Sequence, residues 1–522
     1  MSTNGAIVFL ATGMAWLAVV LQPLFLFYLF AYNTWNLTLI VLSWRAVRRF
    51  VGAHFTADLD LIDDTLATKP LTMIVPAYNE EVTIVDSINN LLQSDYPRLE
   101  VVVVNDGSKD RTLEVLQQAF HLRRTDLPYR PALQTAHVRA MYEATVPLPK
   151  QVVRLVVLDK ENGGKADALN AGTNASTCPY VVSLDADSIL DQRALKEMMR
   201  ALQEDPLLMA LGGQVAIANG CVVKNGRVVS VGLPRNDPAR FQMIEYLRSF
   251  TTGRTGLDRM GCVLILSGVF AVFDKDLLIR AGGYLTRFSD SRLVAEYVGL
   301  ETDTVCEDME VVVRLHRYCR DKGIKRRVGF LPHPVAWTEV PENLDSLRKQ
   351  RGRWHRGLRE SLHYHGAMLF RPRYGRIGAI ALPAFWLFEY LGPMYELLGY
   401  LFVIFGLLLG ALSGRHVISG EYFLAFFLVS CAYAVFVNLL AILVGSWRFR
   451  YGLADRLQRS LLPYSRPRDV GLMLGYAVLE PFLWRPLSLW WRLRGQFDAW
   501  RGKSGWEKFA RIGFQTGEHA GA

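Results

Sequence analysis

The segment VVSLDADS at positions 181–188 holds two acidic residues, Asp185 and Asp187, at the end of an apolar, β-branched run. On a β-strand, a spacing of two residues puts both carboxylates on the same face. Hard oxygen donors at a strand end suit Mg²⁺ or Mn²⁺ bound against a diphosphate. Because Asp-x-Asp is a common sequence, the segment alone also fits an ordinary strand that ends in a solvated acidic turn.

Five further polar clusters accompany this segment. In chain order they are PAYNE at 76–80, VNDGS at 104–108, NGGKADALN at 162–170, CEDME at 306–310 and QRGRW at 350–354. Each has an ordinary structural explanation when taken alone. The first two fit turns, the third a solvated lysine at a helix start, the fourth a helix N-terminal acid and the fifth a basic surface helix. Their number and fixed order favour a shared site.

The elements that must position these clusters alternate between strands and helices over residues 70–215. Strands are predicted at 71–80, 99–108, 152–160, 181–188 and 209–217, with helices at 82–92, from 111 and at 165–172. Such alternation implies an α/β fold with a parallel, doubly wound sheet, whose ligands bind at the carboxyl ends of strands. The basic insert at 122–150 has no assigned role.

The remainder of this region contains a hairpin, two strands and several helices. We predict the hairpin turn at 224–227, helices at 241–257 and 306–317, strands at 264–273 and 326–340, and a long basic helix at 344–365. The segment at 285–305 cannot be placed. The predicted strand at 264–273 contains Ser267 and Gly268.

Long apolar segments at both ends of the chain predict an integral membrane protein. Residues 1–44 carry no charge, 377–412 carry only two glutamates, and 422–447 carry none. About 20 apolar residues cross the hydrocarbon core of a bilayer. The segment at 469–492 contains Glu480, Pro481, Arg485 and Pro486, which predicts a broken or re-entrant helix. The apolar run at 6–44 is long for one straight span, and Pro23 is expected to kink or break it.

The net charge of +10 does not indicate a nucleic-acid partner. Residues 445–522 hold 13 Lys and Arg against 6 Asp and Glu, beside the membrane segments. There the basic residues set topology and attract anionic lipid. The sequence RAVRR at 45–49 places that end of the first apolar run in the cytoplasm. The six cysteines form no CxxC pair and are expected to be free thiols.

Taken together, the six ordered clusters resemble those of membrane-embedded, processive family-2 glycosyltransferases, the group of cellulose, hyaluronan, chitin and poly-N-acetylglucosamine synthases. The resemblance covers about residues 70–410 and the flanking membrane segments. It implies a GT-A-type nucleotide-sugar transferase domain. It also implies a UDP-sugar donor, a growing polysaccharide as acceptor, Mg²⁺ or Mn²⁺, and export or accessory subunits as partners.

The resemblance assigns the donor site to residues of the first four clusters. Tyr78, Asn79, Glu80 and Asp106 would hold the uracil and ribose, since a strand-end Asp can accept from a base N–H while an aromatic ring stacks on the base. Lys165, a compact cation, would lie by the sugar or diphosphate. Asp187 would coordinate the metal, with Asp185 beside it toward the ribose and metal.

The last two clusters would hold the catalytic base and the acceptor. Asp308 would remove the proton from the acceptor hydroxyl, with Glu307 as the neighbouring candidate. Direct attack with a single base implies inversion, so an α-linked donor yields a β-glycoside. Arg353, with Gln350, would grip the diphosphate, and Trp354 would stack under the acceptor sugar. Ser267 and Gly268 match an acceptor-pocket position, although a core strand is the alternative.

The predicted organisation has four parts: a membrane anchor at 1–50, a cytosolic transferase domain at 51–375, transmembrane or re-entrant helices at 376–495 and a basic cytosolic tail at 496–522. The predicted product is a β-linked polysaccharide made from UDP-N-acetylglucosamine or UDP-glucose and passed across the plasma (bacterial inner) membrane. Two alternatives stay open: a non-processive transferase that adds one sugar to a lipid, and a permease with an accessory nucleotide-binding domain.

Overall fold

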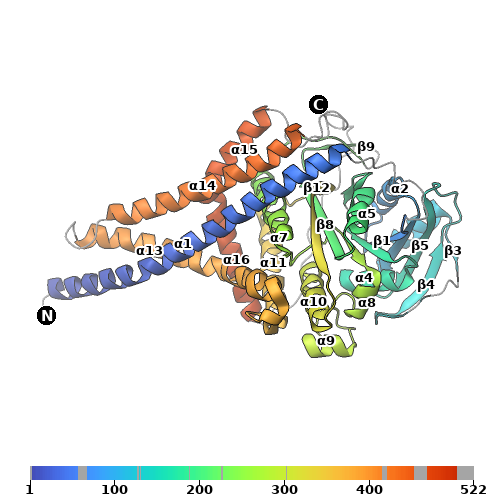
Figure 1. The fold of residues 1–522 in the computed structure, drawn as a ribbon, viewed down its shortest axis with the longest axis horizontal. Coiled ribbons are helices and arrows are strands. Elements are labelled where there is room, and N and C mark those ends of the chain that lie inside the picture. Colours follow the sequence, from blue (N-terminus) through green and yellow to red (C-terminus); the bar gives the residue numbers. More distant parts are fainter. Residues whose placement is uncertain are drawn as a thin grey trace.

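The computed structural model describes residues 3–56, 68–125, 129, 131–186, 188–224, 227–300, 302–413, 420–451 and 467–501. Its centre is a ten-stranded sheet in the order β3-β4-β5-β2-β1-β6-β11-β8-β12-β7. Helices pack on both faces of the sheet, and long helices project away from it on one side (Figure 1). The predicted α/β fold is therefore confirmed.

Four strands form the parallel core of the sheet: β5 (Val152–Lys160), β2 (Leu99–Asp106), β1 (Leu71–Ala77) and β6 (Tyr180–Leu184). Met73 and Val101 pack on one face, and Ile74 and Val102 on the other. Successive strand residues point to opposite faces, so these continuous valine-rich runs fill two apolar layers at once. The polar clusters that follow the four strands therefore emerge at one edge of the sheet.

The helices on the two faces differ. The face of Met73 is covered by α2 (Ile84–Leu92), α3 (Thr112–Phe120) and α5 (Ala194–Glu204). The face of Ile74 is covered by α4 (Lys165–Ala175) and α10 (Glu307–Asp321). Two short helices, α8 (Lys275–Arg280) and α9 (Arg292–Tyr297), follow the strand β11, and α9 lies in the segment that could not be placed.

The outer strands make the sheet mixed. β11 (Phe270–Asp274) runs antiparallel to β6 and to β8 (Leu208–Ile217), whereas β12 (Arg327–Thr338) runs parallel to β8 and antiparallel to β7 (Ile189–Leu190). At the other edge, the basic insert supplies β4 (Val138–Glu143), antiparallel to β5, and β3 (Arg123–Arg124). The strands predicted over residues 70–215 are parallel to one another as expected, since β8 runs in the same direction as β6. The antiparallel strands β3, β4, β7 and β11 are additions that the strand–helix alternation did not predict.

The strand predicted at 264–273 is correct only in its second half. Residues 264–269 lie outside any strand, and the Phe270 amide donates to the carbonyl of Ser267 to close a turn. The backbone groups of Gly268 contact side chains of α4 and α10 instead of a neighbouring strand. The hairpin strands β9 (Val222–Lys224) and β10 (Arg227–Ser230) pair antiparallel as predicted, and the two turn residues between them lie outside the described residues.

The predicted helix at 241–257 is part of a longer helical segment. It consists of α6 (Asp237–Tyr246), the π-helix η2 (Leu247–Arg254) and α7 (Thr255–Met260). The long basic helix is α11 (Leu344–Tyr364), followed by the short turns η3 (Gly366–Met368) and η4 (Pro372–Tyr374). π-Helical turns are rare and often occur at functional sites.

Two glycines let α11 approach its neighbours closely. A Cβ on Gly357 would lie 2.4 Å from the Cys306 side chain, immediately before α10. A Cβ on Gly495 of α16 (Arg485–Trp500) would lie 2.8 Å from the Cα of Gly352. Helix α11 is therefore packed between the start of α10 and a carboxyl-terminal helix.

Long apolar helices project from the sheet domain (Figure 1). Helix α1 (Thr3–Thr56) is continuous through Pro23 and packs against α13 (Gly392–Ser413) and α14 (Gly420–Tyr451). In the described part of the chain, Val20–Arg49 and Phe423–Gly445 are long and apolar enough to cross a membrane. The helices at Ile377–Tyr390 and Gly392–Leu408, bent by 42°, form a third such stretch if they count as one span. The chain is a membrane protein.

The remaining carboxyl-terminal helices are interrupted. Helix α15 (Pro467–Leu479), the π-helix η9 (Glu480–Trp484) and α16 follow one another, and η5 (Ile377–Ala381), α12 (Leu382–Ala384) and η6 (Phe385–Tyr390) precede α13. Glu480 is buried and pairs with Arg485 and Arg248. Residues 414–419, 452–466 and 502–522 lie outside the described residues. All six cysteines are free thiols, as predicted.

Candidate active site

Lys165 lies where three of the predicted clusters meet. Its Nζ lies 2.5 Å from Asp185 Oδ1 and 3.3 Å from Glu307 Oε1, and it donates a 3.1 Å hydrogen bond to the carbonyl of Gly268. Burial by itself lowers the pKa of Lys165, but the carboxylates of Asp185 and Glu307 outweigh burial and raise the pKa above its ordinary value. The ammonium group therefore stays charged beside two acidic side chains.

Asp308 adjoins this cluster. Its Oδ2 accepts a 3.0 Å hydrogen bond from the amide of Gly268. Burial and the adjacent Glu307 raise the pKa of Asp308 to about 6, while Lys165 and Arg254 lower it. Such a carboxylate is mostly ionised at pH 7 and can accept a proton. Ser267 and Gly268 line a small cavity together with Lys165, Glu307 and Asp308.

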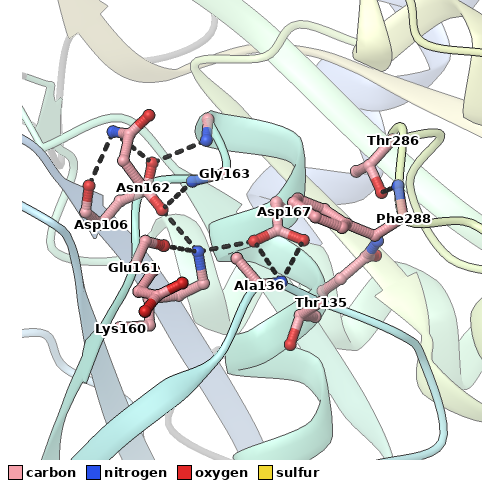
Figure 2. A network of polar contacts seen from close by, with 12 residues as sticks. Asp106, Thr135, Ala136, Lys160, Glu161, Asn162, Gly163, Asp167, Thr286 and Phe288 are labelled. Carbon is pink, nitrogen blue, oxygen red and sulfur yellow. Dashed lines mark hydrogen bonds and ion pairs between the residues drawn. The ribbon is translucent and has the colours of Figure 1, made fainter.

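Asp106 holds the loop that leads to Lys165. Its Oδ1 accepts from the amide of Gly163 at 3.0 Å, and its Oδ2 accepts from the amide of Gly164 at 2.8 Å and from Asn162 Nδ2 at 3.2 Å (Figure 2). Together with Lys160, these donors use the four lone-pair positions of the carboxylate. A nucleotide base that bonded to Asp106 would have to displace one of them.

Lys160 and Asp167 support the candidate site from beneath, and the sequence analysis did not identify them. Lys160 Nζ lies 2.6 Å from Asp106 Oδ1 and 2.5 Å from Asp167 Oδ2, and both residues of the second pair are fully buried (Figure 2). Asp167 also accepts from the amide of Ala136, at 3.2 Å to Oδ2. Lys160 is the last residue of β5 and Asp167 belongs to the NGGKADALN cluster, but no local pattern shows that a buried lysine joins two carboxylates.

The PAYNE and NDGS clusters form two linked loops. Asn79 has a positive φ of 57°, which asparagine tolerates, and its Oδ1 accepts from the amide of Lys109 at 2.8 Å. The amide of Glu80 donates to Thr112 Oγ1 at 2.9 Å, and Glu80 Oε2 accepts from Thr83 Oγ1. Tyr78 follows β1 in the same loop and is partly exposed. These turn and capping contacts place the four residues that were predicted to hold the uracil and ribose at neighbouring strand ends.

The QRGRW cluster lies on α11, next to the start of α10. Cys306 Sγ lies 3.9 Å from the carbonyl of Trp354. Burial and the nearby Asp308 raise the pKa of the Cys306 thiol, and the Arg353 guanidinium opposes that shift, which puts both charges close to this cysteine. The Oε1 atom of Gln350 is buried and has no hydrogen-bond partner within the described part of the chain. The cluster therefore lies beside the acidic site.

Asp187, the residue predicted to coordinate the metal, lies outside the described residues. Among those that are described, no group of three or more His, Cys, Asp or Glu side chains could hold a metal ion. Asp185 presents a carboxylate at the site, and the buried hydroxyl of Ser188 has no hydrogen-bond partner there. These hard oxygen donors fit Mg²⁺ or Mn²⁺.

Arg254 and Glu245 also lie near the site, although neither was among the predicted site residues. Arg254 ends the π-helix η2, and its guanidinium lies over the Phe250 ring at 4.0 Å from the centroid. Burial lowers the pKa of Arg254 to about 10, and Asp308 opposes that shift. Glu245, on α6, pairs with Arg351 of the QRGRW cluster. Both belong to a predicted helix without a motif, so only the tertiary structure brings them to the site.

Two family models match the chain: "Glycosyl transferase family 2" over residues 72–147 and "Glycosyltransferase like family 2" over residues 133–357. The chain is 29% identical over 293 residues to a poly-beta-1,6-N-acetyl-D-glucosamine synthase of Staphylococcus aureus strain COL, covering 56% of this chain and 55% of that protein. The corresponding enzyme of Staphylococcus epidermidis is 28% identical over 292 residues, with the same coverage. The chain thus spans about half the length of these curated relatives.

Among solved structures, the chain is similar to a mannosyltransferase, PcManGT, from Pyrobaculum calidifontis in complex with GDP-Man and Mn²⁺. The identity is 18% and the TM-score is 0.46, with 91% of this chain and 99% of the other covered. A likeness of this degree does not extend the donor or the metal of that enzyme to this chain.

Proposed function

Because the chain belongs to glycosyltransferase family 2, we propose that it is an inverting, processive enzyme that polymerises a β-linked polysaccharide from a UDP-hexose. The observation that supports this most directly is the convergence of Lys165, Asp185, Glu307 and Asp308 around Gly268. The relatives named as poly-N-acetylglucosamine synthases favour UDP-N-acetylglucosamine over UDP-glucose as the donor.

Asp308 is the proposed base. The acceptor hydroxyl oxygen attacks the anomeric carbon of the donor sugar, and its proton passes to Asp308. The bond from that carbon to the β-phosphate oxygen breaks, and its electron pair leaves with UDP. One displacement inverts the anomeric centre. The amide of Gly268 orients the carboxylate of Asp308, and Glu307 is engaged by Lys165.

The donor side is formed by Lys165, Asp185 and the loops after β1 and β2. Lys165 lies beside the diphosphate and offsets its negative charge. Arg353 donates two parallel hydrogen bonds to the phosphate oxygens. Asp187, together with Asp185, would hold Mg²⁺ or Mn²⁺, which stabilises charge on the departing UDP. Tyr78, Asn79, Glu80 and Asp106 frame the uridine.

The acceptor side leads from α11 into the helical bundle. Trp354 supplies an aromatic floor for the terminal sugar. A cavity among α1, α13, α14 and α16 is lined by aromatic and charged side chains, including Tyr28, Tyr395 and Arg485. Tyr28 and Tyr395 stack at 4.5 Å between centroids, and such rings suit saccharide faces. This cavity is the proposed path of the polymer, since α16 both lines it and packs on α11.

The transferase domain is proposed to face the cytoplasm from the plasma (bacterial inner) membrane. Arg45, Arg48 and Arg49 follow the apolar part of α1, and Arg371, Arg373 and Arg376 precede the apolar stretch that begins at Ile377. Basic residues flank spans preferentially on the cytoplasmic side. The loop at 414–419 then lies on the opposite side of the membrane.

A screen of UDP-sugars tests the proposal. Purified enzyme is incubated with UDP-N-acetylglucosamine or UDP-glucose and Mg²⁺ or Mn²⁺, and both UDP release and polymer mass are measured. Release of UDP together with a polymer of many residues supports the proposal. A product with a single added sugar, found in the lipid fraction, would instead establish a non-processive transferase.

The pH dependence of activity should report on Asp308. With its pKa raised to about 6, the base is ionised above that pH, so kcat/KM should fall about tenfold per unit as the pH drops below 6. Arg254 lowers this pKa, so Arg254→Met should move the falling limb to higher pH. The exposed Arg259, on α7, provides the control, and Arg259→Met should leave the profile unchanged. An unshifted limb in the Arg254 variant would contradict this electrostatic role.

Replacement of Trp354 should separate elongation from donor hydrolysis. Trp354→Ala removes the stacking surface for the acceptor and leaves the diphosphate site intact, so product length should fall while UDP release without acceptor persists. The loss of one aromatic contact corresponds to roughly a threefold to tenfold effect on acceptor use. Trp500→Ala, at an exposed position on α16, is the control. Polymer of normal length from the Trp354 variant would exclude the proposed floor.

A further inference from the structure

Trp354 is in contact with a cation from its own helix. The guanidinium carbon of Arg351 lies over the indole ring, 4.7 Å from its centroid. The two residues are three apart on α11 and therefore share one face of the helix. Attraction between a cation and the ring face favours this arrangement. One face of the indole is thus covered by the guanidinium of Arg351.

Arg351 is in turn held by a residue from a different segment. Its Nη2 donates to Oε2 of Glu245 on α6. The side chains are only 12% and 14% exposed, so water screens their attraction weakly. Three groups therefore form a sequence of contacts, from the Glu245 carboxylate through the Arg351 guanidinium to the Trp354 ring.

Glu245 is itself fixed relative to the membrane helices. Helix α6 continues into η2, where Arg248 Nη1 donates to Asn438 Oδ1 of α14 at 2.8 Å and lies 3.4 Å from Glu480 Oε1 of η9. Asn438 and Glu480 are both buried. The position of Glu245 is thereby tied to the helices that line the cavity proposed for the polymer.

We propose that Glu245 and Arg351 are positioning residues that fix the orientation of the Trp354 ring for the acceptor sugar. This inference rests on the proposed function, in which Trp354 binds the acceptor. Stacking contributes its full free energy to sugar binding only if the ring is already held in place. Otherwise part of that free energy is offset by the entropy lost when the side chain becomes ordered. The pair supplies that order from the face opposite to the sugar.

The test measures primer use and donor hydrolysis in the same preparations. The full-length enzyme, in detergent, is given UDP-N-acetylglucosamine and a soluble N-acetylglucosamine oligosaccharide as primer. Glu245→Gln and Arg351→Met should each raise the KM for the primer about threefold to tenfold, the range of one cation–π contact, while donor hydrolysis stays within twofold of wild type. Arg351→Lys, which keeps a cation over the ring, should recover part of the loss. Arg348→Met, a matched change on α11 at an exposed ion pair, should change neither quantity.

The double variant Glu245→Arg/Arg351→Glu separates positioning from simple stabilisation. It restores an ion pair between the helices but puts a carboxylate over the indole. We expect thermal stability to recover and donor hydrolysis to stay within twofold of wild type, while the primer KM stays high. Recovery of the primer KM as well would show that the pair only holds the helices together and would overturn the proposal.

Failure of the inference and failure of the proposed function have different signatures. If wild-type enzyme extends the primer and Trp354→Ala impairs it, but Glu245→Gln does not, the positioning role alone is excluded. If wild-type enzyme releases no UDP and extends no primer with any UDP-sugar, the proposed function falls and the positioning role falls with it.

Discussion

Replacing Asp308 with asparagine is expected to abolish glycosyl transfer while donor affinity stays close to that of wild type. The amide keeps the size of the side chain and can still accept from the Gly268 amide, but it cannot take the proton of the acceptor hydroxyl. Loss of a positioned base costs about 10²- to 10⁴-fold in rate. The measurement is kcat for polymer formation together with the Kd for UDP.

Glu307 provides the matched control for this prediction. Its Oε1 lies 3.3 Å from Lys165 Nζ, so Glu307→Gln removes one negative charge beside the lysine but leaves the proposed base in place. This variant should therefore retain far more activity than the Asp308 variant. The opposite order of the two variants would move the base to Glu307. A loss of UDP binding in Asp308→Asn as large as that in a metal-site variant would assign Asp308 to the donor site.

Replacing Asp187 with alanine is expected to abolish activity and to weaken UDP binding chiefly when Mn²⁺ is present. The motif assigns this carboxylate to the metal, which offsets charge on the diphosphate as the sugar leaves. Without it, Asp185 remains, but that carboxylate lies 2.5 Å from Lys165. Calorimetric titration of UDP with and without Mn²⁺, paired with turnover, measures both effects.

Asp191 offers a control from the same segment. Its carboxylate accepts a hydrogen bond from the amide of Arg193 in the turn before α5. Asp191→Asn therefore removes one negative charge, as Asp187→Ala does, but at a position outside the proposed metal site. The two variants should differ strongly in Mn²⁺-dependent UDP binding. Normal turnover by Asp187→Ala would remove the residue from the metal site.

Local sequence patterns were sufficient for the elements that hold the site. The valine-rich runs of β1, β2 and β5 are apolar on both faces because both faces are buried, and that property is visible in the residues themselves. The membrane helices could also be predicted from the sequence, because an uncharged apolar stretch long enough to cross a bilayer has few other structural explanations. The six polar clusters identified the family because several weak motifs occurred in one order.

Sequence patterns failed where pairing partners come from distant parts of the chain. The antiparallel insertion of β11 between β6 and β8 has no local signature, and neither does the start of that strand at Phe270 rather than at residue 264. Strand direction within a sheet is set by how the connections pack, not by the alternation of side chains along one strand.

The sequence by itself therefore determined which residue types stand at each strand end, and the tertiary structure decided which of them meet. Lys165 pairs with Asp185, which is 20 positions later in the chain, and with Glu307, which is 142 positions later. In the buried interior, Lys160 pairs with both Asp106 and Asp167. Glu245 and Arg254 reach the site only because α6 and η2 pack against it. The physical reason is that periodicity records the local backbone geometry, whereas a charge acts on whatever the fold brings within a few ångströms.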